Sequence, residues 1–444
     1  MQFTLWCAVS LAAPSILFVN RVFPPDRGAT GRCLADLGGR LAAAGWRVTV
    51  VADGIADGTH RDAPAGVTVH RTGSAVPEGE RPDARAYLES LGRLVWRAVR
   101  LPRHDVIVTM TDPPLLALAG PTLAARHGAA ALHWCHDLYP DLLPVLGVRV
   151  PEALRGLAAR AMRRALRRHD GIVAIGRCMR DRLTDMGVPA DRLTVLPNWP
   201  DPAVMPVRHA DNRFRRSLAA ETGTEGGRFI VAYSGTLGLA HPMDGVLDAA
   251  ARLQDSDPGV LFLLVGDGRG FAAVEAEAAR RRLRNLRRLP WQPSERLAES
   301  LSAPDLHLVA MDPAAEGMLV PSKLSGVQAA GRPCLFLGPD GSEAAARVAG
   351  CGVVIDPFDG AAIAEAVRAY AADPGRCARE GERAAQRAAD WTADRAAVAF
   401  AQLVPSLVRR HGPRPAREWI APGRTAPECP APDCSASACR VPHA

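Results

Sequence analysis

Two histidines and a carboxylate follow one another closely at the end of an apolar run in the first half of the chain. The run AAALHWC ends beside a second histidine and an aspartate, which gives the set His133, His136 and Asp137. A polar group at the end of a buried strand can face a cleft and take a proton from a bound hydroxyl group. His136 and Asp137 are therefore candidates for that role. The alternative is that the histidines are core residues with satisfied hydrogen bonds.

The segment VPSKL offers groups for a second kind of chemistry, the stabilisation of a leaving diphosphate. Negative charge grows on a diphosphate as its bond to carbon breaks, and cations or amide groups stabilise it. Lys323 is the first candidate, and Ser322 with the amides of the following helix start would complete an anion site. The alternative is a solvated lysine on a surface loop, because Pro321 and Ser322 also form an ordinary helix start.

Two glycine-containing loops follow apolar runs in the second half of the chain. They consist of Gly235, Thr236, Leu237 and Gly238 in the first loop and Gly266, Asp267 and Gly268 in the second. Ligands of open α/β sheets bind at the carboxyl ends of the strands. We expect the first loop to face a diphosphate, with His241 as the basic residue that follows it. The second loop is expected to approach a nucleotide base.

A third loop of small residues precedes the first helical pattern of the chain. It contains Gly28, Ala29, Thr30 and Gly31, whose backbone amides can face a phosphate or a sugar. The alternative is a glycine turn that serves chain geometry alone. Neither this loop nor the segment GDGRGF has the three spaced glycines of the dinucleotide fingerprint, which disfavours an NAD enzyme.

Short β-rich runs alternate with helical patterns along the chain, which predicts βαβ units and parallel sheets. The first series of runs lies at 15–20, 46–53, 105–111, 129–135, 171–176 and 193–198. The second series lies at 229–235, 260–266, 286–291, 305–311, 333–338 and 352–356. The predicted fold class is α/β, with two Rossmann-like domains that face each other across a cleft. The Pro-, Asn- and Asp-rich segment 197–212 between the two series predicts a hinge.

The predicted organisation has five parts. They are an N-terminal extension at 1–14, an N-terminal Rossmann-like domain at 15–200, a C-terminal Rossmann-like domain at 201–390, a helix at 391–410 that returns toward the first domain, and a disordered tail at 411–444. The extension resembles a signal peptide but lacks a basic start and runs directly into the first strand. In the tail, the spacing of Cys429, Cys434 and Cys439 fits no usual zinc site.

The composition is that of a soluble globular protein, with 48% hydrophobic and 23% charged residues. The net charge of +7 is carried by clustered arginines, which favours anionic partners but not nucleic acid. Scattered cysteines in apolar segments fit reduced thiols in a cytosol. No stretch reaches the roughly 18 apolar residues that a spanning helix needs.

The segment 154–170 predicts an amphipathic helix. One side carries Arg160, Arg163, Arg164, Arg167 and Arg168, and the apolar side, which includes Leu154, is expected to pack inward. The basic side is either a solvated face or a contact with anionic lipid headgroups, to which each arginine contributes about 1 kcal/mol.

Taken together, several strings resemble glycosyltransferase family 4, in particular the bacterial transferases of capsule, colanic acid and O-antigen assembly that carry a Pro-Ser-Lys segment. They are ILFVNRVFPPDRGATGR, LHWCHDLYPDLLP, AIGRCMRDRL, VLPNWPDP, AYSGTLG, LLVGDG, VPSKLSGVQAAGRP and GCGVVIDP, in family order over about residues 15–400. The resemblance implies a GT-B fold and a hexosyltransferase that retains the anomeric configuration. It also implies that the domain at 15–200 binds the acceptor and that the domain at 201–390 binds a nucleotide-sugar donor, with UDP favoured. No metal or other cofactor is expected to be required.

The resemblance extends to the acceptor, the location and the site. The acceptor is expected to be a lipid-linked saccharide of cell-surface polysaccharide synthesis, which places the enzyme in the cytoplasm and peripherally on the inner face of the cell membrane. Asp137 and His133 match family positions. The family's paired glutamates are missing: Gly326 occupies the place of the second and Met318 that of the first, with Glu316 as a candidate replacement.

Two rival functions remain from the sequence. A nucleotide-sugar epimerase can use a similar pair of domains, and it would act on the sugar nucleotide alone. A catalytically silent homologue would bind the donor without turnover, and the missing glutamates keep this alternative open. Carboxylates at glycosidase spacing cannot be identified, which makes hydrolysis the weaker class.

Overall fold

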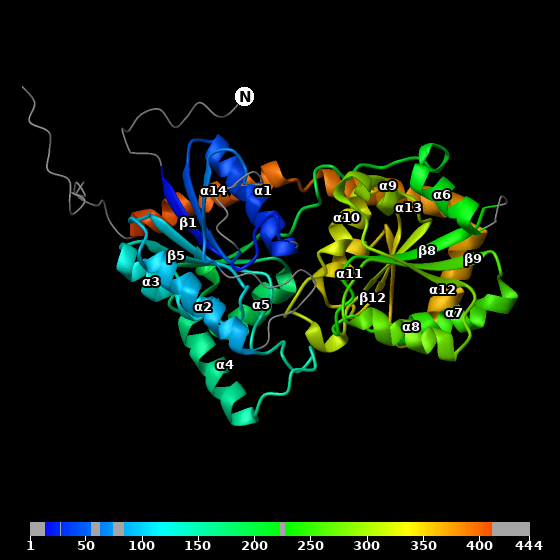
Figure 1. Ribbon diagram of the computed structural model, residues 1–444, viewed down its shortest axis with the longest axis horizontal. Coiled ribbons are helices and arrows are strands. Elements are labelled where there is room, and N and C mark those ends of the chain that lie inside the picture. The colour runs from blue at the N-terminus through cyan, green and yellow to red at the C-terminus, as the bar shows by residue number, and fades with distance from the viewer. Residues whose placement is uncertain (1–13, 27, 55–62, 74–83, 223–226, 411–444) are drawn as a thin grey trace, which may run out of the picture. The chain divides into compact units, whose positions relative to one another are not determined.

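Two parallel β-sheets form the framework of the chain (Figure 1). The computed structural model describes residues 14–26, 28–54, 63–73, 84–222 and 227–410. The first sheet has the order β3-β2-β1-β4-β5-β6-β7 and the second the order β10-β9-β8-β11-β12-β13. Two Rossmann-like sheets were predicted from the two series of β-rich runs, and this prediction is confirmed.

The strands of the first sheet are β1 (Ser15–Val19), β2 (Arg47–Ala52), β3 (Val67–Arg71), β4 (Val106–Thr109), β5 (Ala130–Cys135), β6 (Gly171–Ala174) and β7 (Leu193–Val195). Those of the second are β8 (Phe229–Ser234), β9 (Val260–Val265), β10 (Leu286–Leu289), β11 (Leu306–Ala310), β12 (Cys334–Leu337) and β13 (Gly352–Ile355). The inner strands β1, β4, β5, β9, β11 and β12 are buried along their whole length, because helices cover both faces of a parallel sheet.

The sequence analysis missed β3. This strand pairs with β2 at the edge of the first sheet, from Val48↔Val67 to Ala52↔Arg71. Its burial is only partial, with Thr68 exposed and Val69 buried. An edge strand needs little apolar surface, so its sequence differs only weakly from that of a loop.

The helices that connect the strands of the first sheet are α1 (Ala29–Ala43), α2 (Ala84–Val99), α3 (Gly120–His127), α4 (Glu152–Leu166) and α5 (Arg177–Asp185). Short 3-10 turns include η1 (Leu116–Leu118). The remaining helices are α6 (Arg213–Thr222), α7 (Asp244–Ser256), α8 (Gly270–Arg280), α9 (Leu297–Ser302), α10 (Lys323–Ala329), α11 (Glu343–Val348), α12 (Gly360–Ala372), α13 (Pro374–Ala389) and α14 (Ala393–Arg410).

Helix α14 lies against the first sheet, although it follows the second sheet in the sequence (Figure 1). Phe400 packs 6.0 Å from Phe18 of β1, measured between ring centroids. Arg40 of α1 forms an ion pair of 2.6 Å with Asp394. The helix therefore adds apolar side chains to the core of the first domain.

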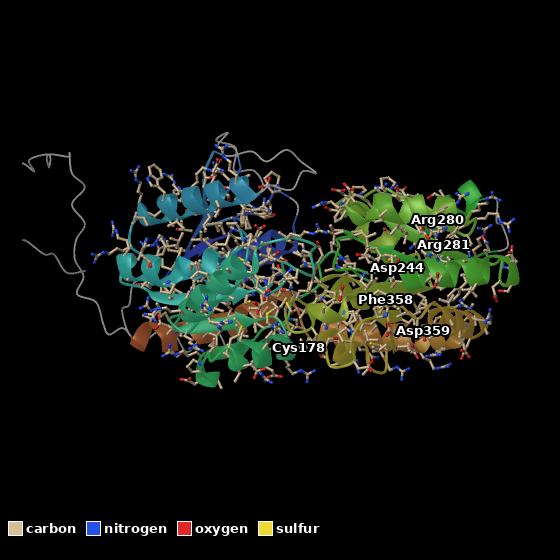
Figure 2. All side chains as sticks on the ribbon, turned by 90° about the horizontal axis from the view of Figure 1, so that it is seen from below. Cys178, Asp244, Arg280, Arg281, Phe358 and Asp359 are labelled. Atoms are coloured by element: carbon tan, nitrogen blue, oxygen red, sulfur yellow. The ribbon has the colours of Figure 1, made fainter. Side chains whose placement is uncertain are left out.

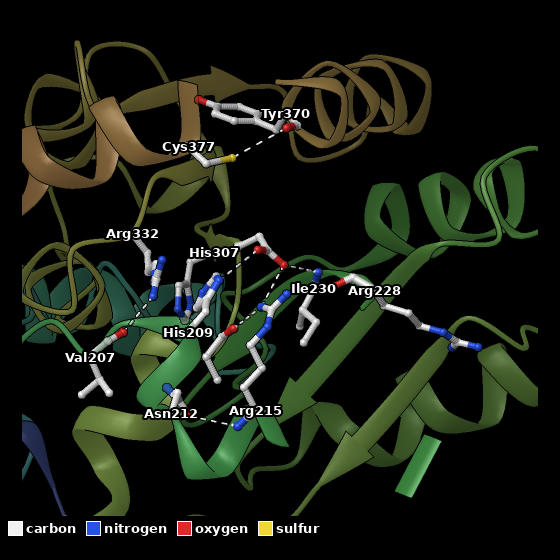
Figure 3. Close-up of polar contacts among 12 residues, drawn as sticks. Val207, His209, Asn212, Arg215, Arg228, Ile230, His307, Arg332, Tyr370 and Cys377 are labelled. Carbon is white, nitrogen blue, oxygen red and sulfur yellow. Dashed lines mark hydrogen bonds and ion pairs between the residues drawn. The ribbon is translucent and has the colours of Figure 1, made fainter. Parts of the chain in front are cut away.

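Polar contacts attach the later part of the predicted hinge segment 197–212 to the second domain (Figure 3). Val207 donates its amide to Ser302 and accepts a hydrogen bond from Arg332. Arg215 pairs with Asp305 at 3.0 Å, just before β11 begins. Desolvation lowers the pKa of the neighbouring His209 to about 4, so this histidine is neutral near pH 7. Of the predicted hinge at 197–212, the part from residue 207 onward is held by these contacts.

The two domains also meet through charged and backbone groups. The backbone amide of Arg177, at the start of α5, donates to the Glu343 carboxylate at 2.8 Å, and its guanidinium donates at 3.2 Å. The Glu343 amide contacts the sulfur of Cys178, which is labelled in Figure 2. Leu138 donates its amide to the Met318 carbonyl at 2.8 Å. A short segment before α10 is thereby joined to the strand end that carries Asp137.

Some predictions concern residues outside the described part of the chain. The N-terminal extension lies there except for its last residue, and so do the tail at 411–444 and its three cysteines. Among the described helices, none has both the length and the apolar character needed to cross a membrane.

Candidate active site

Lys323 lies over the glycine loop that follows β8. Its ammonium is 3.2 Å from Nε2 of His241 and 5.3 Å from the ring centroid of Tyr233. A Cβ atom at Gly235 would lie only 3.0 Å from Cε of the lysine, so glycine leaves room for the side chain to pass. Desolvation lowers the pKa of Lys323 to about 8. The predicted neighbours Lys323, His241 and Gly235 are thus brought together.

The two glycine loops of the second sheet interlock at its carboxyl edge. Leu237 donates its amide to the Asp267 carbonyl at 2.9 Å. Gly266 has a φ of +135°, and a Cβ there would be 2.3 Å from the Gly235 carbonyl oxygen. A Cβ at Gly268 would be 2.4 Å from the Leu237 carbonyl oxygen. Glycine is required at these positions because two backbones approach each other closely.

Lys323 is the single lysine of the chain. Every other residue in the combined lysine and arginine count is an arginine. This signal was available in the sequence and was missed. Arginine presents a planar fork of donors, whereas lysine ends in a compact ammonium. In a chain that uses arginine everywhere else, the narrow passage over Gly235 gives a physical reason for lysine at this one position.

The other predicted donor residues lie around this pair with less distinctive contacts. Ser322 is half-buried and precedes α10, but its side chain makes no capping hydrogen bond. The exposed Asp267 accepts a hydrogen bond from the Gly268 amide at 2.7 Å. Thr236 accepts a hydrogen bond from the Tyr233 hydroxyl through its carbonyl, at 2.9 Å. Because α10 has only seven residues, we expect more from the Lys323 charge than from a helix dipole.

The positions of the missing glutamates show why no carboxylate replaces them directly. A Cβ at Gly326 would lie 3.3 Å from Leu301 of α9, so a side chain there would press against an apolar neighbour. Met318 is buried. The Glu316 carboxylate lies beside Gly341, in the loop that follows β12, where a Cβ would be 2.4 Å from Oε1.

The two candidate histidines of the first sheet are buried. Nδ1 of His133 is 3.1 Å from the Thr109 hydroxyl, and burial lowers the pKa of His133 well below its usual value. Nδ1 of His136 is 3.5 Å from the Asn198 side chain, and burial lowers the pKa of His136 to about 3. Both histidines are therefore neutral near pH 7. Burial favours the core interpretation that the sequence left open for them.

Asp137 is the more accessible of the three candidates, because it is half-buried at the carboxyl end of β5. The Thr111 hydroxyl accepts hydrogen bonds from the amides of His136 and Asp137, at 2.8 Å and 3.3 Å. Asp137 also borders a cavity of about 10 Å³, which is roughly the room that one water molecule needs. Met162 and Leu166 of α4 also line this cavity.

The loop before α1 has a packing role in the structure. A Cβ at Gly28 or at Gly31 would lie 2.9 Å from the Val22 side chain. The exposed Ala29 begins the helix, and the Thr30 hydroxyl is 3.4 Å from the Asn20 side chain. The glycines thus permit close packing of the helix start on the loop after β1, and the amides remain candidates for a ligand.

An ion pair at the same edge of the first sheet was not found from the sequence. Arg21 follows β1 and donates two hydrogen bonds to Asp112, which follows β4, at 2.7 Å and 2.8 Å. Its guanidinium also lies 5.4 Å from the Tyr87 ring centroid. Arg21 and Asp112 are 91 positions apart in the chain, so no local motif could reveal their ion pair.

Two family models match the chain, one over β2 to β7 of the first sheet and the other over the whole second sheet. The "Glycosyl transferase 4-like domain" matches residues 28–199, and "Glycosyl transferases group 1" matches residues 214–387. A protein of Escherichia coli K12 named as a colanic acid biosynthesis glycosyl transferase, WcaI, is 29% identical over 225 residues, which are 49% of this chain and 54% of that protein. A Pseudomonas aeruginosa glycosyltransferase named WbjE is 26% identical over 60% of this chain and 66% of its own length. The chain thus spans about half to two thirds of these curated relatives.

Solved structures share the fold at lower identity. HepE of Anabaena, crystallised with UDP-glucose, is 17% identical, with a TM-score of 0.66 over 88% of this chain and 99% of that one. WaaG, described as a glycosyltransferase of lipopolysaccharide biosynthesis, has a TM-score of 0.63 at 17% identity and covers 88% of this chain and 99% of its own. At this identity the likeness concerns the fold alone.

Proposed function

The chain belongs to the glycosyltransferases of the GT-B fold, and we propose that it transfers a sugar from a nucleotide diphosphate to a lipid-linked saccharide with retention of the anomeric configuration. The observation that carries the proposal is the Lys323 ammonium beside His241, above two interlocked glycine loops. Such a site offers a cation to a diphosphate on which negative charge develops. We propose that Gly235 and Gly266 let the diphosphate approach the backbone closely.

The donor is proposed to be a UDP-sugar. HepE was crystallised with UDP-glucose, and this chain shares its fold. The proposed base site adjoins the loop of Gly266, Asp267 and Gly268, where the exposed Asp267 offers a hydrogen-bond acceptor. The acceptor is proposed to be a saccharide of cell-surface polysaccharide synthesis, in line with the name of the WcaI relative.

Asp137 is proposed to orient or deprotonate the acceptor hydroxyl group. It is half-buried, and the backbone bonds to Thr111 fix the strand end that carries it. A neutral His136 beside it adds no positive charge that would oppose proton uptake by the carboxylate. Buried histidines are poor bases here, because burial disfavours their charged form.

A lipid-linked acceptor requires that the protein reach a membrane surface, and helix α4 is the proposed contact. Five arginines line an open groove of about 370 Å³: Arg160, Arg163 and Arg164 of α4, and Arg167 and Arg168, which directly follow the helix. None of them forms an ion pair with a carboxylate in the described part of the chain. The charges are thus available to anionic headgroups, on the cytoplasmic face of the cell membrane in this proposal.

One sequence prediction about this helix was wrong. Leu154 was expected on the inward side, but its side chain is 58% exposed, and Leu157 is 59% exposed. The buried residues of α4 are Ala159, Met162, Ala165 and Leu166, so only the second half of the helix packs on the domain. The first turns of α4 extend beyond that contact (Figure 1). The proposed membrane surface therefore has apolar side chains at its N-terminal end as well as arginines.

The test is a transfer assay with purified full-length protein, a panel of nucleotide sugars and extracted lipid-linked saccharides. We expect release of the nucleoside diphosphate only when donor and acceptor are both present, and the product linkage read by NMR should retain the donor's anomeric configuration. Conversion of the sugar nucleotide without an acceptor would instead indicate an epimerase. Donor binding with no turnover on any acceptor would indicate the silent homologue.

A further inference from the structure

The single lysine of the chain has surroundings that favour a neutral, nucleophilic amine. No carboxylate of the described residues forms an ion pair with Lys323, and its side chain is partly buried against Gly235. The Tyr233 ring face, 5.3 Å from the ammonium, favours the charged form. Burial without a counter-ion acts in the opposite direction, because it makes the ammonium lose its proton more readily. The lowered pKa of about 8 agrees with this geometry.

The neighbouring histidine can serve either protonation state of the amine. Nδ1 of His241 lies 3.1 Å from the Gly238 amide and 3.3 Å from the Gly238 carbonyl oxygen. When Nδ1 donates to the carbonyl, Nε2 can accept a proton from the lysine ammonium 3.2 Å away. When Nδ1 accepts from the amide, Nε2 carries the proton and can donate to a neutral amine. The loop thus accommodates both states through a change of histidine tautomer.

We propose that Lys323 is a site of covalent acylation, and that small acyl phosphates modify it in the donor-free protein. The inference rests on the proposed donor site, because the phosphate of the reagent would occupy the place of the donor diphosphate. The Lys323 nitrogen attacks the carbonyl carbon, the bond from that carbon to the phosphate oxygen breaks, and inorganic phosphate leaves. Nε2 of His241 takes the proton that the nitrogen loses, which leaves a neutral amide.

Acylation at this position would close the donor site. It removes the cation of the phosphate contact and adds an acyl group where a Cβ at Gly235 would already be 3.0 Å from Cε. Competing groups are few in the described part of the chain. Arginines stay protonated and are not nucleophilic, and burial raises the pKa of the Cys33 thiol to about 11. The half-buried Cys178 would give a thioester, which hydroxylamine removes while it leaves an amide intact.

The experiment treats full-length protein with acetyl phosphate from pH 7 to pH 9, followed by hydroxylamine and peptide mass spectrometry. We expect acetyl-Lys323 to form at least tenfold faster than acetylation of the N-terminal amine, with a rate that rises through pH 8. UDP should suppress the reaction at least tenfold. Because the chain has one lysine, the variant Lys323→Arg is a control that should take up no stable side-chain acetyl group.

Two comparisons separate the inference from its alternatives. Inorganic phosphate should slow the acetylation of Lys323 by acetyl phosphate. It should not slow the acetylation of Lys323 by p-nitrophenyl acetate, which carries no phosphate. Acetylation of Lys323 no faster than that of the N-terminus, or unchanged by UDP, would overturn the proposal. Both readouts are independent of glycosyl transfer, so failure of the transfer assay would leave this result standing, and the reverse also holds.

Discussion

At the scale of single residues, charge and burial separate groups that look alike in the sequence. His133, His136 and Asp137 are neighbours in the chain, yet both histidines are buried and neutral while the aspartate is half-buried. Lys323 is the single lysine in a chain that otherwise uses arginine. These differences point to one candidate group in each domain.

Removal of the Lys323 charge is expected to reduce turnover about a hundredfold or more, because its contact strengthens as the diphosphate leaves. In the parent protein the ammonium is present below its pKa of about 8 and is lost above it. The affinity for UDP should therefore fall by up to about tenfold per pH unit above pH 8. Calorimetry of Lys323→Ala should show weak, pH-independent binding, and turnover equal to the parent's with saturating donor would refute the role.

Replacement of Asp137 by Asn is expected to lower kcat by about 10²–10⁴-fold, because the amide cannot take a proton from the acceptor. Affinity for UDP should stay within about twofold, since the change lies in the other domain. Asp141→Asn is the matched control: this carboxylate is also near the strand end but pairs with Arg182 at 3.4 Å. Equal kcat losses in the two variants would assign the effect to general disturbance of this loop.

At the scale of elements, the strand ends and helix starts decide where the candidate groups lie. The loops after β8 and β9 meet through the hydrogen bond from Leu237 to Asp267. The two faces of helix α4 border different features, because Met162 lines the cavity near Asp137 while Arg164 lines the outer groove.

The substitution Gly266→Ala should destabilise the protein by about 3 kcal/mol. The residue has φ +135° and a Cβ would lie 2.3 Å from the Gly235 carbonyl oxygen, so strain and overlap both contribute. Gly92→Ala in α2 is the matched control, because a Cβ there meets nothing within 4 Å, and it should stabilise the helix by up to about 1 kcal/mol. Urea unfolding checks both, and UDP affinity should fall only in the first variant.

Two sets of α4 variants should reveal the two components of membrane binding. The triple change of Arg160, Arg164 and Arg168 to Gln should weaken binding to anionic vesicles about a hundredfold at low salt. The double change of Leu154 and Leu157 to Ser should weaken the vesicle binding that persists in high salt by about tenfold.

The control for these variants is Leu88→Ser, which changes a side chain that is 64% exposed on α2. It should bind vesicles as the parent does. If all variants sediment with vesicles equally, α4 is a solvated face. Self-association that the leucine variant abolishes in the absence of lipid would identify this end of α4 as a contact between copies of the protein.

At the scale of the whole molecule, contacts distant in sequence join the two domains. The Ser325 hydroxyl of α10 donates to the Asn198 carbonyl at 3.0 Å, and the Asn198 side chain lies near His136. The same helix begins with Lys323. The helix of the proposed donor site is therefore connected to the strand end of the proposed acceptor site by two consecutive hydrogen-bonded contacts.

The ion pair of Arg177 with Glu343 should add to the stability of the assembled domains. The Glu343 side chain is 7% exposed and accepts two hydrogen bonds from Arg177, so Glu343→Gln should cost about 1–2 kcal/mol in urea unfolding. Glu382→Gln, at an exposed position of α13, is the control and should change stability by less than about 0.5 kcal/mol. A Glu343 variant as stable as this control would show that the contact adds nothing.

The sequence by itself determined the α/β class, the two sheets and the groups around Lys323. Apolar runs that alternate with helical patterns are local signals, and a glycine loop after a strand lies at a sheet edge in any parallel sheet. The short edge strand β3 was beyond this reasoning, because one partner strand and partial exposure leave a weak apolar pattern.

Only the tertiary structure decided which candidate groups are accessible. Burial of His136 depends on Asn198, which is 62 positions away, and the exposure of Leu154 depends on how far α4 extends beyond the domain that its second half contacts. A side chain at position 326 would meet Leu301, which belongs to another helix. Solvent access and close packing are set by segments that meet in space, and local periodicity carries no information about which segments these are.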